Sequence, residues 1–161
     1  AGNPEDSGTD APPAETEALT ILHRVCKGFI DLLFVREVNK QKRYSILDWK
    51  SDSLENYGDA EIKKKVDEDY SVQRVLYSYC LIQWLKQFYS KRADGSGEGL
   101  SEQQIFEQHF GGIYYAFLRG TDGATGKGIY AHTWKDYASL EKAYGEVKKL
   151  MSKKKKDEGE N

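Results

Sequence analysis

Cysteine and proline are both scarce in this sequence. The two cysteines, Cys26 and Cys80, each lie inside an apolar run, which argues against a disulfide framework and favours a reducing, intracellular setting. All three prolines fall within the first 13 residues, among Gly, Ser, Thr, Asp and Glu. Such a segment cannot bury enough apolar surface to fold, so we expect residues 1–17 to form a disordered tail.

Long apolar runs and an excess of one charge are also missing. No run approaches the roughly 20 residues that cross a bilayer, and no basic segment followed by an apolar one marks a secretory signal. The formal net charge is -2, so bulk charge does not indicate a nucleic-acid binder, and such a role must come from local placement. We expect a cytoplasmic protein without a membrane segment.

The 161 residues suffice for one domain with a real core. The last ten, SKKKKDEGEN, are a charge block with little to pack, so we expect a folded part at 18–151 and a disordered charged tail at 152–161. Two such tails suggest a fragment of a larger protein.

Hydrophobic patterning predicts the elements between the tails. β-Branched and long apolar residues predict strands, and apolar residues three or four apart predict helices. We expect a polar turn at 36–43, a loop with a helical turn or two at 51–70, and a glycine-rich break at 92–101. The predicted elements are a strand at 19–35, a strand at 43–50, a helix at 70–90, a strand at 111–120 and a helix at 137–151. The first two strands form a hairpin, and this order predicts an α/β (α+β) fold, a mixed sheet with helices against it.

Charged residues interrupt the two strands of the hairpin. Asp31 lies within GFIDLLF, and Asp48 and Lys50 end YSILDWK. Alternation places Asp48 and Lys50 on one face, with Cα atoms roughly 6.6 Å apart, and a suitable register would bring Asp31 beside Asp48. Two carboxylates about 4 Å apart repel by about 4 kcal/mol at an effective dielectric of 20, and a hard divalent cation relieves that repulsion. The set therefore favours a metal site, in which the cation polarises a phosphate and a water and Lys50 positions or helps deprotonate the water.

A D-x-K at a strand end also has an ordinary interpretation, a solvated edge with a surface ion pair worth less than about 1 kcal/mol. Asp31 favours the metal site, because a mid-strand carboxylate is hard to solvate. A plain α+β domain would instead be stabilised by Asp31→Leu, without other consequence.

The ordered set GFID, LDWKS, Q-x-x-x-Y and HFGG…FLRG, from about Lys27 to Tyr130, resembles the C-terminal nuclease domain of the bacterial exodeoxyribonuclease V beta subunit (the RecB type), of the PD-(D/E)xK nuclease superfamily. The resemblance implies a restriction-endonuclease-like fold. It implies that Asp31 and Asp48 bind Mg²⁺ (or Mn²⁺), that the Trp49 carbonyl joins them, and that Lys50 is the catalytic lysine.

In Q-x-x-x-Y, Gln73 and Tyr77 lie one helical turn apart and would face the active site or the DNA backbone. Tyr77 could equally be a core aromatic with a polar tip.

The family also draws a metal-binding histidine from a helix upstream of GFID. Only the tail precedes Leu19 here, so we expect that helix to be absent. His23 is misplaced for the role and is expected to have a partner in the core or at the sheet edge. We expect His109 to cap or pack, and His132 to lie in a loop without companion ligands.

Other basic residues are candidate DNA contacts. Arg119 ends a strand, and Lys63, Lys64 and Lys65 follow the site as a possible DNA-facing patch. GATGKG at 123–128 lacks the first Gly and the final Ser or Thr of a phosphate loop, so no nucleotide site is expected.

The resemblance thus implies a Mg²⁺-dependent DNA nuclease domain, an exodeoxyribonuclease acting on phosphodiester bonds. It would belong to a bacterial helicase–nuclease complex in double-strand break repair and recombination. The implied partners are DNA, bound without sequence preference, and the gamma and alpha subunits of exodeoxyribonuclease V. The alternative is a non-catalytic docking or DNA-holding domain on the same fold, inactive as an isolated fragment.

Overall fold

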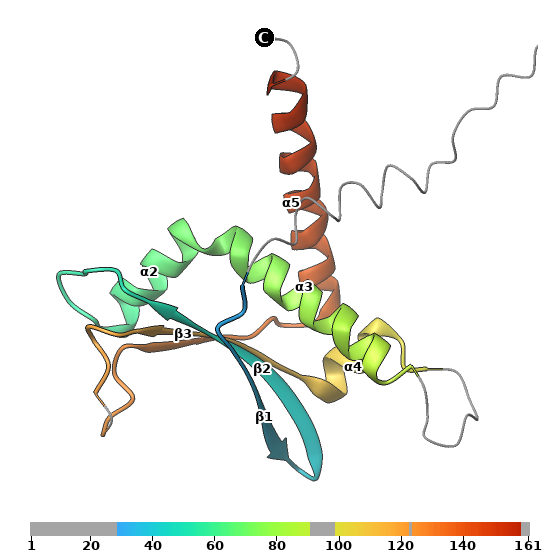
Figure 1. The fold of residues 1–161 in the computed structure, drawn as a ribbon, viewed down its shortest axis with the longest axis horizontal. Coiled ribbons are helices and arrows are strands. Elements are labelled where there is room, and N and C mark those ends of the chain that lie inside the picture. Colours follow the sequence, from blue (N-terminus) through green and yellow to red (C-terminus); the bar gives the residue numbers. More distant parts are fainter. Residues whose placement is uncertain (1–28, 91–98, 123, 159–161) are drawn as a thin grey trace, which may run out of the picture.

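The structure is a computed structural model that describes residues 29–90, 99–122 and 124–158, with side chains up to residue 152. Within these residues the strands form one four-stranded sheet in the order β1-β2-β3-β4. β1 pairs antiparallel with β2, β2 parallel with β3, and β3 antiparallel with β4. The elements are β1 (Leu32–Val38), β2 (Gln41–Lys50), α2 (Asp59–Asp69), α3 (Ser71–Phe88), α4 (Glu102–His109), β3 (Phe110–Phe117), β4 (Ile129–His132) and α5 (Tyr137–Glu158). The expected mixed α/β fold, a sheet flanked by helices, is confirmed (Figure 1).

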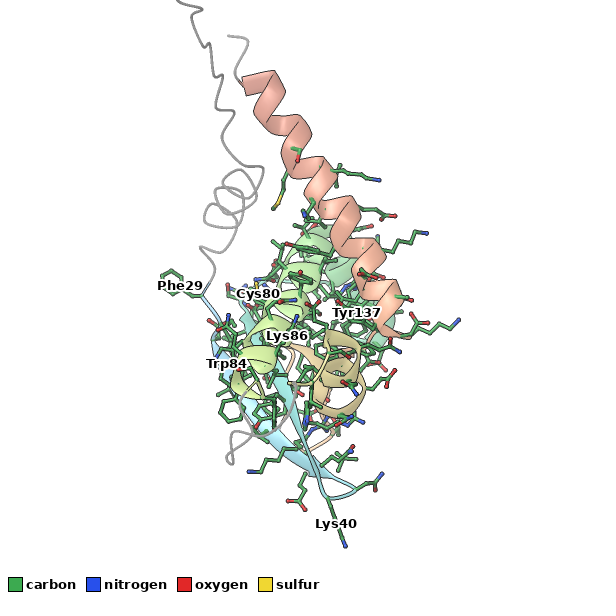
Figure 2. The ribbon with its side chains drawn as sticks, turned by 90° about the vertical axis from the view of Figure 1, so that its right-hand side faces the viewer. Phe29, Lys40, Cys80, Trp84, Lys86 and Tyr137 are labelled. Atoms are coloured by element: carbon green, nitrogen blue, oxygen red, sulfur yellow. The ribbon has the colours of Figure 1, made fainter. Side chains whose placement is uncertain are left out.

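The hairpin of β1 and β2 is tighter than the sequence predicted. Asn39 and Lys40 both have positive φ, 52° and 64°, the conformation of a two-residue turn whose twist matches the flanking strands. The polar turn expected at 36–43 is therefore wrong, since pairing continues to Val38 opposite Gln41. Figure 2 shows Lys40 at the tip of this hairpin.

The core lies on the face of the sheet that side-chain alternation in β2 predicted. Tyr44, Ile46, Asp48 and Lys50 are all buried, whereas Trp49 on the other face is exposed. The neighbouring β3 is apolar, as expected for a strand with partners on both sides, and contributes Ile113, Tyr115 and Phe117 to the same face. This packing leaves Asp48 and Lys50 as charged groups at the edge of an apolar core.

Three elements were incompletely predicted or not predicted. The loop with a helical turn or two expected at 51–70 holds a longer helix in its second half, the 11-residue α2, where Ile62 and Val66, one helical turn apart, are buried. The helix α4 begins with a capping box between Ser101 and Gln104, in which each side chain bonds the other's backbone N–H. The strand β4 has four residues, too few for a clear alternating pattern.

The helices α2 and α3 follow one another along one side of the sheet, and the C-terminal half of α5 extends away from it (Figure 1). The sequence predicted that the folded part ends at residue 151, whereas α5 continues to Glu158. None of the helices in the described ranges is both long and apolar enough to cross a membrane. The first 28 residues lie outside the described residues. They include His23, Cys26 and the segment before Leu19, where the family's upstream helix was expected to be absent.

Candidate active site

The charged pair Asp48 and Lys50 lies at the end of β2 and faces the helices. Lys50 Nζ is 2.6 Å from Asp48 Oδ2, and the side chains are only 9% and 6% exposed. Taking two charges out of water costs several kcal/mol per ion, so this pair needs further hydrogen bonds to be tolerated.

Gln73, in the first turn of α3, supplies those bonds. Its Oε1 accepts a hydrogen bond from Lys50 Nζ at 2.9 Å, and its Nε2 donates to Asp48 Oδ1 at 3.2 Å. The same Nε2 lies 3.0 Å from the hydroxyl of Tyr77, one turn further along α3. The amide therefore satisfies both members of the ion pair and links them to Tyr77.

The hydroxyl of Tyr77 lies at this polar network rather than deep in the core. It donates to the carbonyl of Phe29 at 2.8 Å. Burial raises the pKa of Tyr77, and the nearby Asp48 and Asp31 carboxylates raise it further, while the Gln73 hydrogen bond opposes them. The Tyr77 hydroxyl therefore links the Gln73 amide to the segment that precedes β1.

Asp31 is placed differently from the expectation. The sequence put it inside a buried strand, but it lies at a bend just before β1 and is exposed. The reason is that β1 is the edge strand of the described sheet, so this carboxylate reaches solvent. Its Oδ2 accepts a hydrogen bond from the backbone N–H of Trp49 at 2.9 Å. Since Leu32 pairs with Leu47, one further step along the register sets Asp31 opposite Asp48.

Tyr70, which the sequence did not identify as a site residue, packs against Lys50. Lys50 Nζ lies 3.6 Å from the centroid of the Tyr70 ring and 5.5 Å from that of Tyr115. The Tyr70 hydroxyl donates to Asp52 Oδ2 at 2.7 Å. The available signal was spacing, because Tyr70 precedes Gln73 by three residues and so lies near the same helix face.

Asp52 anchors this tyrosine. Burial alone would raise the pKa of Asp52, but the Tyr70 hydrogen bond and the ammonium of Lys65, 3.4 Å away, outweigh it and hold that pKa below its ordinary value. Burial and the hydrogen bond to this carboxylate raise the pKa of Tyr70 to about 12. The phenol therefore stays protonated and acts as the donor.

Of the other predicted basic residues, Lys65 contacts this cluster through Asp52. On α2, Lys63 pairs with Asp67, and Lys65 pairs with Asp69 and Asp52. Their charges are thus partly compensated, while Lys64 and Arg119 are exposed. Arg119 is two residues beyond the end of β3, and its neighbour Leu118 donates its N–H to the Lys50 carbonyl. These placements leave the DNA-facing role of the basic residues a prediction.

The two histidines in the described ranges have other surroundings than the pair of Asp48 and Lys50. The Nδ1 atom of His109 is 3.0 Å from the Lys42 carbonyl, and its ring stacks on Tyr89. His132 closes β4 instead of lying in a loop, and burial, with a smaller effect of the Arg74 guanidinium, lowers its pKa to about 4. Within the described ranges no three His, Cys, Asp or Glu side chains gather as a metal-binding group.

Comparison with known proteins finds similarity to one kind of protein. No family model matches the chain. Three curated relatives are each named RecBCD enzyme subunit RecB. The one from Buchnera aphidicola is 38% identical over 101 residues, and the one from Escherichia coli is 35% identical over 101 residues; each alignment covers 60% of this chain and 7% of the relative. The one from Haemophilus influenzae is 24% identical over 123 residues, 73% of this chain and 9% of the relative. The chain therefore contains a RecB-related region and spans less than a tenth of the length of these relatives.

Proposed function

We propose that this chain is a Mg²⁺-dependent DNA nuclease domain that hydrolyses phosphodiester bonds. The observation that carries the proposal is the convergence of Asp48, Lys50 and Gln73 at the end of β2, with Asp31 hydrogen-bonded to the intervening Trp49. A D-x-K at a solvated strand edge would be exposed. Its carboxylate and its ammonium would not both hydrogen-bond to the same amide side chain.

The donor atoms suit a hard divalent cation. Asp31, Asp48 and the Trp49 carbonyl would hold it, and Mg²⁺ prefers few carboxylates because it keeps several of its waters. When bound, such an ion supplies Lewis-acid polarisation of a phosphate and activation of a water. Two carboxylates and one carbonyl are oxygen donors of the kind that Mg²⁺ and Mn²⁺ take.

The remaining groups have roles that follow from their contacts. Lys50 carries three donors and can place a proton or a positive charge beside a scissile phosphate. Gln73 already orients that ammonium through Oε1 and the Asp48 carboxylate through Nε2. Tyr77 fixes Gln73 in turn. Lys64 and Arg119 are both exposed, so each is a proposed contact for a DNA backbone.

The names of the relatives bear on the cellular process in which the domain acts. Their RecBCD naming is consistent with a domain that acts on DNA in double-strand break repair and recombination, as an exodeoxyribonuclease. DNA and the gamma and alpha subunits of such a complex are the proposed partners, and the bacterial cytoplasm is the proposed location. Because the chain spans so little of the relatives, these assignments concern a domain within a longer helicase–nuclease subunit.

Cleavage of end-labelled single- and double-stranded DNA in Mg²⁺, Mn²⁺ or EDTA tests the proposal. We expect metal-dependent degradation by the unaltered chain, lost in Asp48→Asn and in Lys50→Met. Lys86→Met is the matched control, because Lys86 forms a surface ion pair with Glu102 elsewhere on α3. Degradation that persists in both site variants, or needs no metal, would refute the assignment.

Metal binding separates the nuclease from the non-catalytic alternative. A docking or DNA-holding domain would bind DNA equally well with and without Asp31→Ala, Asp48→Ala and Lys50→Ala, and would neither bind Mn²⁺ nor cleave. The nuclease requires Mn²⁺ binding that Asp31→Ala and Asp48→Ala abolish and that Lys50→Ala retains.

A further inference from the structure

The ammonium of Lys50 has an aromatic neighbour that the proposed chemistry leaves without a role. Its Nζ lies 3.6 Å from the centroid of the Tyr70 ring, well inside the range in which a cation is attracted to a ring face. The Lys50 side chain is only 9% exposed, and such an attraction is stronger when the cation is desolvated.

Tyr70 is fixed at both its backbone and its ring. It is the residue between α2 and α3, where its N–H donates to the Val66 carbonyl and its own carbonyl accepts from Arg74 N–H. At the far end of the ring, the hydroxyl donates to Asp52 Oδ2 at 2.7 Å. The Tyr115 ring stacks against it, with centroids 5.9 Å apart. The ring face that Lys50 meets is therefore held before any ligand arrives.

The contacts of Lys50 differ in whether a metal ion bound to Asp48 would disturb them. Asp48 Oδ2 pairs with Nζ, and a divalent ion on Asp48 would compete for that oxygen. Gln73 Oε1 and the Tyr70 ring need no carboxylate to hold the ammonium. Of these two, the ring is the one anchored by a separate carboxylate, Asp52.

We propose that Tyr70, anchored by Asp52, is a positioning residue that, together with Gln73, keeps the Lys50 ammonium at the end of β2 when Asp48 is engaged by a metal ion. This inference rests on the proposed function, since it assigns Tyr70 to the site of that reaction. Tyr70 acts through Lys50 and touches neither DNA nor metal.

The NMR signals of the Lys50 Hε and ammonium protons, observed with labelled lysine, report this contact directly. Protons over a ring face are shifted upfield, so we expect upfield Lys50 signals in the unaltered chain, with and without Mg²⁺. Tyr70→Phe keeps the ring and should keep most of the shift, while Tyr70→Leu should remove most of it and leave only the smaller effect of the Tyr115 ring, 5.5 Å from Nζ. Tyr89→Leu is the control, because Tyr89 caps the opposite end of α3 and contacts Tyr44 and His109 instead.

Cleavage kinetics supply the second measurement. We expect Tyr70→Leu to lower kcat about tenfold with little change in KM for DNA, Tyr70→Phe to restore most of it, and Asp52→Asn to fall between them. If Tyr70 had only a structural role, Tyr70→Leu would reduce the folded fraction. It would not lower kcat at an unchanged KM, and Tyr70→Phe would not restore kcat. The inference is overturned if Tyr70→Leu keeps the upfield signals or full kcat.

The two failures are distinguishable. If the unaltered chain does not cleave DNA, the proposed nuclease fails, and the NMR signals alone decide whether Tyr70 holds Lys50. If the chain cleaves but Tyr70→Leu changes neither signals nor kcat, the nuclease stands and the role of Tyr70 is refuted.

Discussion

Replacing Lys50 by Met removes one member of a buried ion pair and leaves the other charged. Asp48 is 4% exposed, so its carboxylate would stay buried and keep the hydrogen bond from Gln73 Nε2. Truncating one partner of a buried pair costs about 3–5 kcal/mol, and because one hydrogen bond survives we expect the lower end, about 3 kcal/mol. For a domain of this size that loss lowers Tm by roughly 10 °C.

Magnesium should reverse part of this loss. In the unaltered chain the ammonium of Lys50 occupies Asp48 Oδ2 and opposes a second cation. In Lys50→Met that competition is gone, so 10 mM Mg²⁺ should raise Tm more in the variant than in the unaltered chain. Tenfold tighter binding would add about 1.4 kcal/mol at saturation.

Urea and thermal unfolding, followed by circular dichroism in Mg²⁺ and in EDTA, measure both effects. Lys86→Met is again the control, since its pair with Glu102 is 47% and 25% exposed and should be worth less than about 1 kcal/mol. The reasoning fails if Lys50→Met unfolds within 0.5 kcal/mol of the unaltered chain, on the scale of an ordinary surface substitution. It also fails if Mg²⁺ stabilises both proteins equally.

Three further predictions concern Tyr115, His132 and a pair of glycines. The Tyr115 hydroxyl is buried without a hydrogen-bond partner among the described residues, so Tyr115→Phe should be neutral or stabilise by up to about 1 kcal/mol in urea unfolding; a larger loss would reveal a hidden partner. The pKa of His132 is held at about 4, against 6.5 ordinarily, so below about pH 6.5 the unfolded chain binds a proton that the folded chain refuses. Stability should fall from about pH 6.5 to 4, and this slope should flatten in His132→Gln. A Cβ on Gly128 (φ +81°) would meet backbone 2.5 Å away, whereas one on Gly126 (φ +71°) meets nothing within 4 Å. Gly128→Ala should therefore destabilise clearly more than Gly126→Ala, which pays only the conformational cost of about 1–2 kcal/mol, and equal losses would disprove the close approach.

The buried face of β2 could be predicted because alternation is a local property. Tyr44 to Lys50 follow a period of two, and the structure buries that set. The family resemblance, and not local pattern, predicted that Gln73 faces the active site, because α2 lies between β2 and α3 in the chain. The metal and catalytic roles of these residues stay predictions.

Asp31 and Tyr70 show where local pattern was not enough. The run around Asp31 is apolar on both faces, which predicts a central strand, but the order of strands in a sheet depends on distant pairing, and β1 lies at the edge of the described sheet. Tyr70 was hidden because its contact with Lys50 depends on how the α2–α3 junction packs over β2. The prediction of only a helical turn or two at 51–70 underestimated α2, because polar residues outnumber its two buried positions, Ile62 and Val66.

The most direct test of the central claim is the position of a bound ion. Crystals of the chain soaked in MnCl₂ should give an anomalous difference peak at coordination distance from the carboxylates of both Asp31 and Asp48. Asp48→Asn should lose the peak. A peak that touches neither carboxylate, or no peak at concentrations that support DNA cleavage, would contradict the account.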